Sequence, residues 1–285
     1  MSSEAITTLS CDCSPGARNY TLEIGHPRCT VIKIIQDKLL RARLLSTDGV
    51  CEDREVFGDR TMEAIRRYEE VEWLVVSRVV AQSTWQALLG MEDVGPILHT
   101  SGTITPRPQP DNSTCWAACL ASMLDLSVDC VIFHTPVSVL IEGALKNNSE
   151  THVLQNIPAI PGSKHGLVTF YPQGWLTGPL ADLALAGPIM LNTLLEPDIY
   201  SRGYGSAGHC LLIVGVRGRR EPDGKQLILR VWDPLPSRRG TLYSITYYDL
   251  MNRNPLTTFR ITVRETSYRA WGGSGGEFLA RYYPL

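Results

Sequence analysis

The last hundred residues of the chain are dominated by short apolar runs typical of strands. Four such runs are separated by turn-rich segments, at residues 187–194, 209–216, 226–233 and 257–265. An Asp-Gly pair at 223–224 lies between the second and third runs and favours a hairpin turn. An apolar segment at 115–125 precedes them and predicts a helix. We therefore expect an α+β domain, in which a leading helix packs on an antiparallel sheet.

The first third of the chain has a helical pattern instead. Several residues of segment 30–45 recur near helical spacing: Val31, Ile34, Ile35, Lys38 and Leu39. A second helix is predicted from about residue 59, with Thr61 at its N-cap, and a third over 81–90. These segments predict a small three-helix module within residues 22–90. Residues 91–112 contain four prolines and predict a linker or irregular lead-in.

Composition narrows the class of protein. The 285 residues are 44% hydrophobic with a formal net charge of −2, which suits a globular protein of one or two domains. This near-neutral balance argues against a nucleic-acid partner. No apolar run approaches the roughly 20 residues that span a bilayer, so we expect no membrane span. The N-terminus lacks the basic start and apolar stretch of a cleavable signal, so we expect synthesis in the cytoplasm without one.

The eight cysteines do not form a regular metal framework. Cys11, Cys13 and Cys29 lie near His26, but their spacing differs from the ligand pairs of structural zinc sites. Free thiols or a single disulfide are the better interpretation. We expect no metal and no organic cofactor.

Cys115 differs from the other cysteines in its approach, "RPQPDNSTCW" (107–116). Asn112 or Ser113 would cap a helix that begins at Thr114 or Cys115. The thiol would then lie at a helix N-terminus, where unpaired N–H groups and the helix dipole stabilise a thiolate. The backbone N–H of Cys115 would point to a developing oxyanion, and Gln109, returned by the turn, would supply a second donor.

A base for this thiol is predicted at His209. His209 follows a glycine and begins a strand, whereas the other five histidines lie in less suitable segments. The next strand ends in Asp233, so adjacent antiparallel strands would bring this carboxylate to the imidazole and fix its tautomer.

Packing is the simpler interpretation of a cysteine on an apolar helix, and Cys119, Cys130 and Cys210 are interpreted in that way. For Cys115 the combination favours catalysis. A glutamine lies six residues before a helix-opening Cys-Trp, a Gly-His pair begins one strand, and Trp-Asp-Pro ends the next.

The segments "QPDNSTCWAAC", "GHCLLIVGV" and "VWDP" resemble the papain-like cysteine peptidases, particularly the compact bacterial branch. That branch includes peptidases that remove bacteriocin leaders and effector proteases of plant-pathogenic bacteria. The resemblance implies a papain-like domain over 100–285, with Cys115 as nucleophile and His209 as general base and acid. It also implies Asp233 as the orienting residue and Gln109 as the oxyanion donor. Two departures are Asp233 where plant and lysosomal papains have Asn, and a shorter Cys–His interval.

The helical region is similar to the three-helix peptidoglycan-binding module of cell-wall hydrolases. The matching residues are Gln36, Asp48, Gly49, Phe57, Gly58, Thr61, Ala64, Ile65 and Tyr68. The departure is the insertion "CEDRE" at 51–55, in a loop expected to face the ligand. The resemblance implies binding to glycan or stem peptide.

Together the two resemblances imply a bacterial cysteine hydrolase that cleaves amide or peptide bonds of peptidoglycan. With no cleavable signal, we expect an antibacterial effector exported by a specialised secretion system, with a cognate immunity protein as partner. One alternative is an effector protease that cuts a specific protein of the target cell. Others are a non-catalytic wall-binding adaptor and acyl transfer to an amine instead of water.

Overall fold

The structure is a computed structural model that describes residues 30–53, 56–77, 79–89, 95, 97–99, 104–145, 160–170, 177–194, 208–253 and 261–270. The chain divides into two compact units, Met1–Val94 and Gly95–Leu285, which are described separately. The sequence predictions for Cys11, Cys13 and Cys29, and the last residue of the helix predicted over 81–90, fall outside the described residues.

The first unit is helical, as predicted. Its helices are α1 (Thr30–Arg41), α2 (Thr47–Glu52), α3 (Asp59–Val71) and α4 (Gln82–Leu89). The short α2 lies in a segment expected to be a loop. Ile35 and Leu39 are buried on α1 as expected, but Ile32 completes the buried face while Lys38 is exposed. The apolar stripe of α1 is therefore rotated relative to the predicted one.

Asp53 caps the N-terminus of α3, although the sequence suggested Thr61. The helix begins at Asp59, and its N-cap residue Gly58 makes no side-chain capping bond. Instead the Asp53 carboxylate accepts hydrogen bonds from the backbone N–H groups of Arg60, at 3.1 Å, and Thr61, at 2.7 Å. Gly58 is needed because a Cβ there would lie 2.3 Å from Asp53 Oδ1. Asp53 belongs to the "CEDRE" insertion, so this residue of the insertion is buried and structural.

Glu69 is a fully buried carboxyl group in α3. It accepts hydrogen bonds from the Thr84 hydroxyl at 2.7 Å and the Ser77 backbone N–H at 3.0 Å, which join α3 to α4 and to the preceding loop. Burial raises the pKa of Glu69 from 4.5 to about 7, because these bonds and the charge of Arg66 offset desolvation only partly. The folded unit therefore favours the protonated form.

This burial predicts a pH-dependent effect of Glu69→Gln. Because the folded pKa of Glu69 lies above the unfolded value, its contribution to stability falls as pH rises from about 4.5 towards 7. A neutral Gln avoids that loss, so α3 and α4 amides should exchange at least about tenfold more slowly at about pH 8, with little change at about pH 5. Hydrogen–deuterium exchange of the full chain measures this. The control is Glu70→Gln, an exposed neighbour; equal effects of both variants would contradict the prediction.

The second unit contains an antiparallel sheet, so its α+β class is confirmed. The described part of the chain contributes seven strands to it: β1 (Ile97–His99), β4 (Leu167–Phe170), β5 (Ile189–Leu194), β6 (Gly208–Gly218), β7 (Leu227–Asp233), β8 (Thr241–Thr246) and β9 (Ile261–Arg264). Their order is β4-β9-β5-β6-β7-β8, and β1 pairs with β6. The four predicted runs correspond to β5, β6, β7 and β9. β1 lies in the segment that was expected to be an irregular lead-in.

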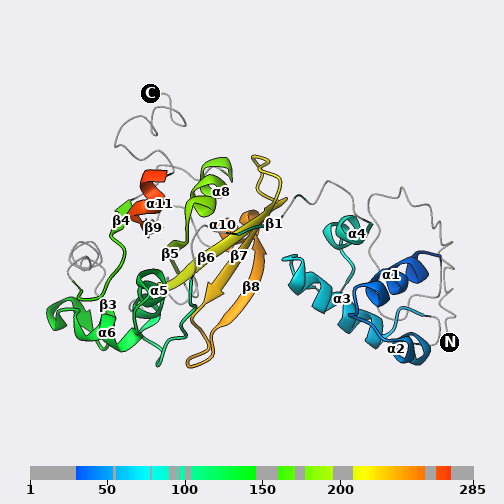
Figure 1. Ribbon diagram of the computed structural model, residues 1–285, viewed down its shortest axis with the longest axis horizontal. Coiled ribbons are helices and arrows are strands. Elements are labelled where there is room, and N and C mark those ends of the chain that lie inside the picture. Colours follow the sequence, from blue (N-terminus) through cyan, green and yellow to red (C-terminus); the bar gives the residue numbers. More distant parts are fainter. Residues whose placement is uncertain are drawn as a thin grey trace, which may run out of the picture. The chain divides into compact units, whose positions relative to one another are not determined.

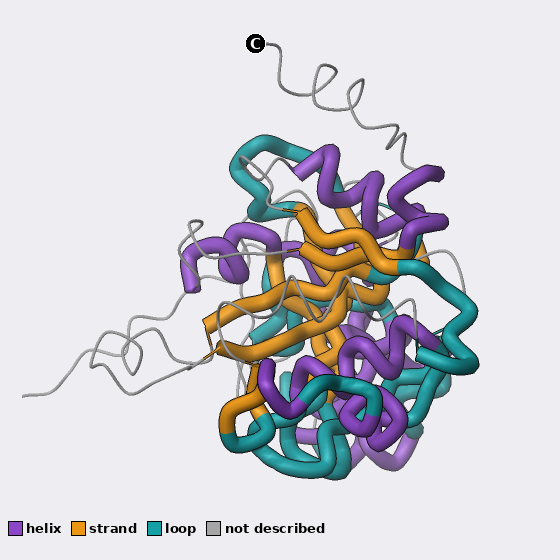
Figure 2. Tube along the Cα trace, turned by 90° about the vertical axis from the view of Figure 1, so that its left-hand side faces the viewer, coloured by secondary structure: helices purple, strands orange, loops and turns teal. Residues whose placement is uncertain are grey.

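Helices cover both faces of this sheet (Figure 1). One face carries α5 (Cys115–Leu124) and α6 (Val128–Phe133). The other carries α8 (Thr177–Ala186), α10 (Tyr247–Arg253) and α11 (Glu265–Ala270). Strand residues alternate between the two cores: Cys210 and Leu212 face α5, whereas Leu211 and Ile213 face α8. Figure 2 shows the strands as a twisted layer with helical segments above and below it.

Two smaller features complete the unit. The turn η2 (Val137–Val139) leads into a hairpin of β2 (Leu140–Ile141) and β3 (Ala144–Leu145). The predicted hairpin between β6 and β7 is present, and Gly224 in its turn has a φ of 68°, which favours glycine. Among the described helices, each is too short or too polar to span a bilayer.

Candidate active site

Helix α5 begins at Cys115, but the predicted caps are used elsewhere. The N-cap residue is Thr114, without a side-chain capping bond. The hydroxyls of Ser113 and Thr114 donate to Asp111 Oδ1 at 2.9 and 3.0 Å, and Asn112 Oδ1 accepts from the Ser237 hydroxyl at 2.9 Å. Burial opposes ionisation of Asp111, but hydrogen bonds from Ser113 and Thr114 outweigh it and lower the pKa of this carboxyl. These turns fix the entry to α5 and leave its first N–H groups without a side-chain cap.

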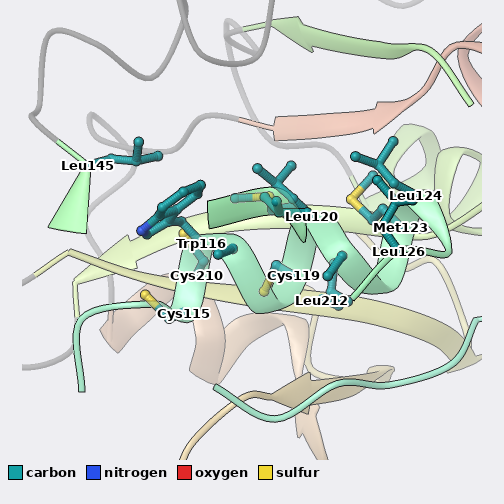
Figure 3. Packing of buried hydrophobic residues seen from close by; sticks show 14 of the residues in the cluster. Cys115, Trp116, Cys119, Leu120, Met123, Leu124, Leu126, Leu145, Cys210 and Leu212 are labelled. Carbon is teal, nitrogen blue, oxygen red and sulfur yellow. The ribbon is translucent and has the colours of Figure 1, made fainter. Parts of the chain in front are cut away.

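Cys115 lies at the N-terminal end of a fully buried helix. Its side chain is only 8% exposed, and Trp116 and Cys119 follow it into the core. Figure 3 shows Cys210 beside Cys115 and Cys119 one turn further along α5. Trp116 donates its indole N–H to Gly143 O at 3.0 Å, so the β2–β3 hairpin is attached to the first turn of α5. The thiol is therefore held in a defined position.

His209 and Asp233 meet where the β6–β7 ladder ends. The last paired residues there are Leu212 and Trp232, and Asp233 is the next residue along β7. His209 Nε2 lies 2.7 Å from Asp233 Oδ1, and the His209 side chain is 5% exposed. The Leu235 backbone N–H donates to the same oxygen at 2.8 Å. Both residues are brought together as the sequence predicted, by neighbouring antiparallel strands.

The electrostatics of the thiol and the imidazole are coupled. Hydrogen bonding from Cys210 lowers the pKa of Cys115 well below its usual range, and hydrogen bonding and charge from His209 add to this against the opposing effect of burial. Burial would lower the pKa of His209, but Asp233 and Cys115 raise it from 6.5 to about 9. Because Nε2 is used by Asp233, Nδ1 is the ring nitrogen that faces Cys115. The pair therefore favours thiolate and imidazolium near neutral pH.

Gln109 is fully buried and is tied to the loop that follows Asp233. Its backbone N–H donates to Pro234 O at 3.2 Å, and its backbone O accepts from the Arg238 N–H at 2.7 Å. Its Nε2 donates to Asp111 O. Gln109 Oε1 accepts no hydrogen bond from the residues that the structure describes. The hydrogen bonds thus connect Gln109 to the His209–Asp233 end of the site and not directly to Cys115, and only the second Nε2–H remains for an oxyanion.

Three features of the site were not predicted. Cys210 lies in the core as predicted, but its hydrogen bonds to the Cys115 thiol were not predicted. The loop at 234–240 holds Gln109, and the β2–β3 hairpin holds Trp116. The hairpin had a weak signal, a Glu-Gly turn at 142–143 between apolar pairs. Gly143 has a φ of 84°, and a Cβ there would lie 2.6 Å from Ser113 Oγ.

This arrangement is suited to nucleophilic chemistry by a thiolate. A deprotonated sulfur, an imidazolium beside it and a carboxylate behind the imidazole are the groups that acyl transfer requires. Within the described ranges, no group of three or more His, Cys, Asp or Glu side chains is placed to hold a metal ion.

No protein-family model matches the sequence, and no curated protein matches it significantly.

The coupled pair predicts that Cys115 reacts with iodoacetamide at acidic pH, because the thiolate persists below the pKa of a free cysteine, about 8.5. His209→Ala removes part of that stabilisation, so alkylation at about pH 6 should slow at least about tenfold while the Cys210 contribution remains. Peptide-resolved mass spectrometry of alkylated Cys115 measures the rate. His134→Ala, on the α6 side, is the control and should leave the rate unchanged. A His209→Ala profile identical to that of the parent would show that His209 does not stabilise the thiolate.

A second prediction concerns the carboxylate. Asp233 raises the pKa of His209 through a hydrogen bond and its charge, so Asp233→Asn should lower that pKa from about 9 by about one unit or more. The pKa of His209 should fall because the neutral amide accepts the Nε2–H but does not attract the imidazolium. Titration of the His209 ring by NMR measures the midpoint. Asp223→Asn removes the same charge from the exposed β6–β7 turn and should leave the midpoint in place. A midpoint that rises or stays constant in Asp233→Asn would refute the proposed pairing.

Proposed function

We propose that this protein is a papain-like cysteine hydrolase that cleaves amide bonds, with Cys115 as nucleophile, His209 as general base and acid, and Asp233 as the residue that orients the imidazole. The observation that carries the proposal is the buried His209–Asp233 hydrogen bond, 2.7 Å long, beside a thiol whose pKa is lowered by its neighbours. A structural cysteine or histidine needs neither feature.

The reaction begins with attack of the Cys115 thiolate on the carbonyl carbon of the scissile amide. The oxyanion is stabilised by the backbone N–H of Cys115 at the start of α5 and by Nε2 of Gln109. His209 gives its proton to the leaving amine, and an acyl-enzyme remains on Cys115. His209 then takes a proton from water, which attacks the acyl-enzyme and releases the acid. Asp233 holds Nε2–H throughout, so that Nδ1 faces the sulfur.

The proposed substrate is the peptide portion of bacterial peptidoglycan. Support comes from the helical unit, whose resemblance to wall-binding modules rests on residues that form its internal contacts. Gln36 Nε2 donates to the Thr61 hydroxyl at 3.0 Å, and Thr61 is bound by Asp53. Phe57 and Ile65 are fully buried in the same core. In this proposal the protein is an antibacterial effector that is exported by a specialised secretion system, and its producer makes an immunity protein.

The test is digestion of isolated peptidoglycan by the full-length protein, with released fragments identified by mass spectrometry. New peptide-bond ends should appear, and Cys115→Ala should reduce their rate of release at least about a thousandfold, because the nucleophile is lost. Cys130→Ala, which removes a thiol from α6, is the matched control and should retain activity.

The outcomes separate the parts of the proposal. Fragments that form equally with Cys115→Ala would exclude Cys115 as the nucleophile. An intact wall, together with Cys115-dependent cleavage of proteins in a target-cell extract, would keep the hydrolase and replace the substrate. Co-sedimentation of Cys115→Ala with insoluble peptidoglycan tests the wall-binding role without catalysis.

A further inference from the structure

The side chain and the backbone of Cys210 are both hydrogen-bond partners of the Cys115 thiol. It lies on β6 directly after His209, is 8% exposed, and belongs to the same buried cluster as Cys115 (Figure 3). Both cysteines are free thiols. The reaction proposed above uses Cys115 and His209, and needs no thiol at position 210. A second thiol against the nucleophile therefore requires its own explanation.

Asn192 offers the Cys210 thiol proton an acceptor other than Cys115. Asn192 is the register partner of Cys210 on β5, and its Oδ1 accepts the Cys210 S–H at 3.1 Å. The single thiol proton has two acceptors in reach, Asn192 Oδ1 and the Cys115 thiolate. When Cys115 is no longer an anion, the proton points to Asn192, and the lone pairs of the Cys210 sulfur are left facing Cys115.

We propose that Cys210 is a resolving thiol that forms a reversible disulfide with Cys115 when Cys115 is oxidised by hydrogen peroxide. Cys115 has the features of an oxidation-sensitive cysteine, since its thiolate is stabilised at the entrance of α5 next to a second thiol. Cys119 is a poor competitor, because it is fully buried one turn deeper and burial raises the pKa of its thiol.

The chemistry balances in two steps. The Cys115 thiolate attacks one peroxide oxygen and the O–O bond breaks. The hydroxide released takes the proton of the His209 imidazolium to become water, and Cys115 becomes a sulfenic acid. The Cys210 sulfur then attacks the Cys115 sulfur, the S–O bond breaks, and the departing hydroxide leaves with the Cys210 proton as a second water. The two thiols together lose two electrons to form the disulfide, and one peroxide accepts them and becomes two waters. A thiol reductant reverses the bond by exchange.

The consequence is a hydrolase that hydrogen peroxide inactivates reversibly and that is protected from permanent damage. A disulfide blocks the nucleophile, yet it prevents the sulfinic and sulfonic acids that no ordinary reductant repairs. This regulatory meaning rests on the proposed function, whereas the disulfide itself rests on the contact between the two cysteines.

The experiment exposes the full-length protein to hydrogen peroxide and maps its peptides by mass spectrometry without reduction. A parallel sample is reduced with dithiothreitol and alkylated with iodoacetamide at about pH 6, which counts the recovered Cys115 thiolate. Cys210→Ser is the informative variant, because serine keeps a hydrogen-bond donor at the same position but cannot form the bond. Cys119→Ala is the control, since it removes the other buried thiol of the site.

A Cys115–Cys210 cross-linked peptide is expected in the parent and in Cys119→Ala. In Cys210→Ser, Cys115 should gain two or three oxygen atoms, and its recovery by dithiothreitol should fall at least about tenfold. Equal over-oxidation of Cys115 in the parent and in Cys210→Ser, or a bond to a different cysteine, overturns the inference. If Cys115 is alkylated at acidic pH but not cross-linked, the redox inference alone fails. If Cys115 reacts with neither reagent, the activated thiolate is absent and the proposed function fails with it.

Discussion

The packing of α5 against β6 is the contact on which the rest of the site depends. All ten residues of α5 are buried, so the helix has little freedom to rotate or slide on the sheet. Cys210 and Leu212 of β6 lie under it in one apolar core. Because His209 directly precedes Cys210, fixing the helix on the strand also fixes the thiol against the imidazole. Core packing therefore sets the position of the proposed nucleophile, Cys115.

A chain of hydrogen bonds joins the segment before α5 to the end of β7 and to the loop that follows it. Trp232 donates its indole N–H to Arg107 O at 3.3 Å, and the Arg107 backbone N–H donates to the Ser122 hydroxyl on α5 at 3.0 Å. Two residues later, Gln109 is bonded through its backbone to Pro234 and Arg238. The segment before α5 and the loop after β7 thus hold each other. A change in either one moves both Gln109 and Asp233, so these residues are coupled in position although they are distant in sequence.

Sequence reasoning succeeded where a feature depends on interactions between residues close in sequence or on adjacent strands, and failed where it depends on distant partners. The four predicted strands, the hairpin at Asp-Gly and the meeting of His209 with Asp233 depend on short-range periodicity and on adjacent strands. The predicted N-cap residues were wrong for both α3 and α5. Asp53 reaches α3 from outside its first turn, and Ser237 takes the side chain of Asn112, so polar side chains had partners that local patterns do not show. The hydrogen bonds from Cys210 to Cys115 were not predicted for a related reason: a buried cysteine on a strand has the same sequence pattern whichever residue it contacts across the core.

Cys115 and Cys119 show how the pKa values of two buried thiols on one helix shift in opposite directions. Both lie on the same face of α5, one turn apart, and both are buried. Burial raises the pKa of Cys119, and the negative charges of Cys115 and Asp233 add to the rise. At Cys115 the same penalty from burial is outweighed by hydrogen bonds from Cys210 and His209. Those donors lie where β6 begins, and neither is among the groups that shift the pKa of Cys119. Exposure is therefore a poor guide to the pKa of a thiol here, because the two thiols differ mainly in what the strand places beside them.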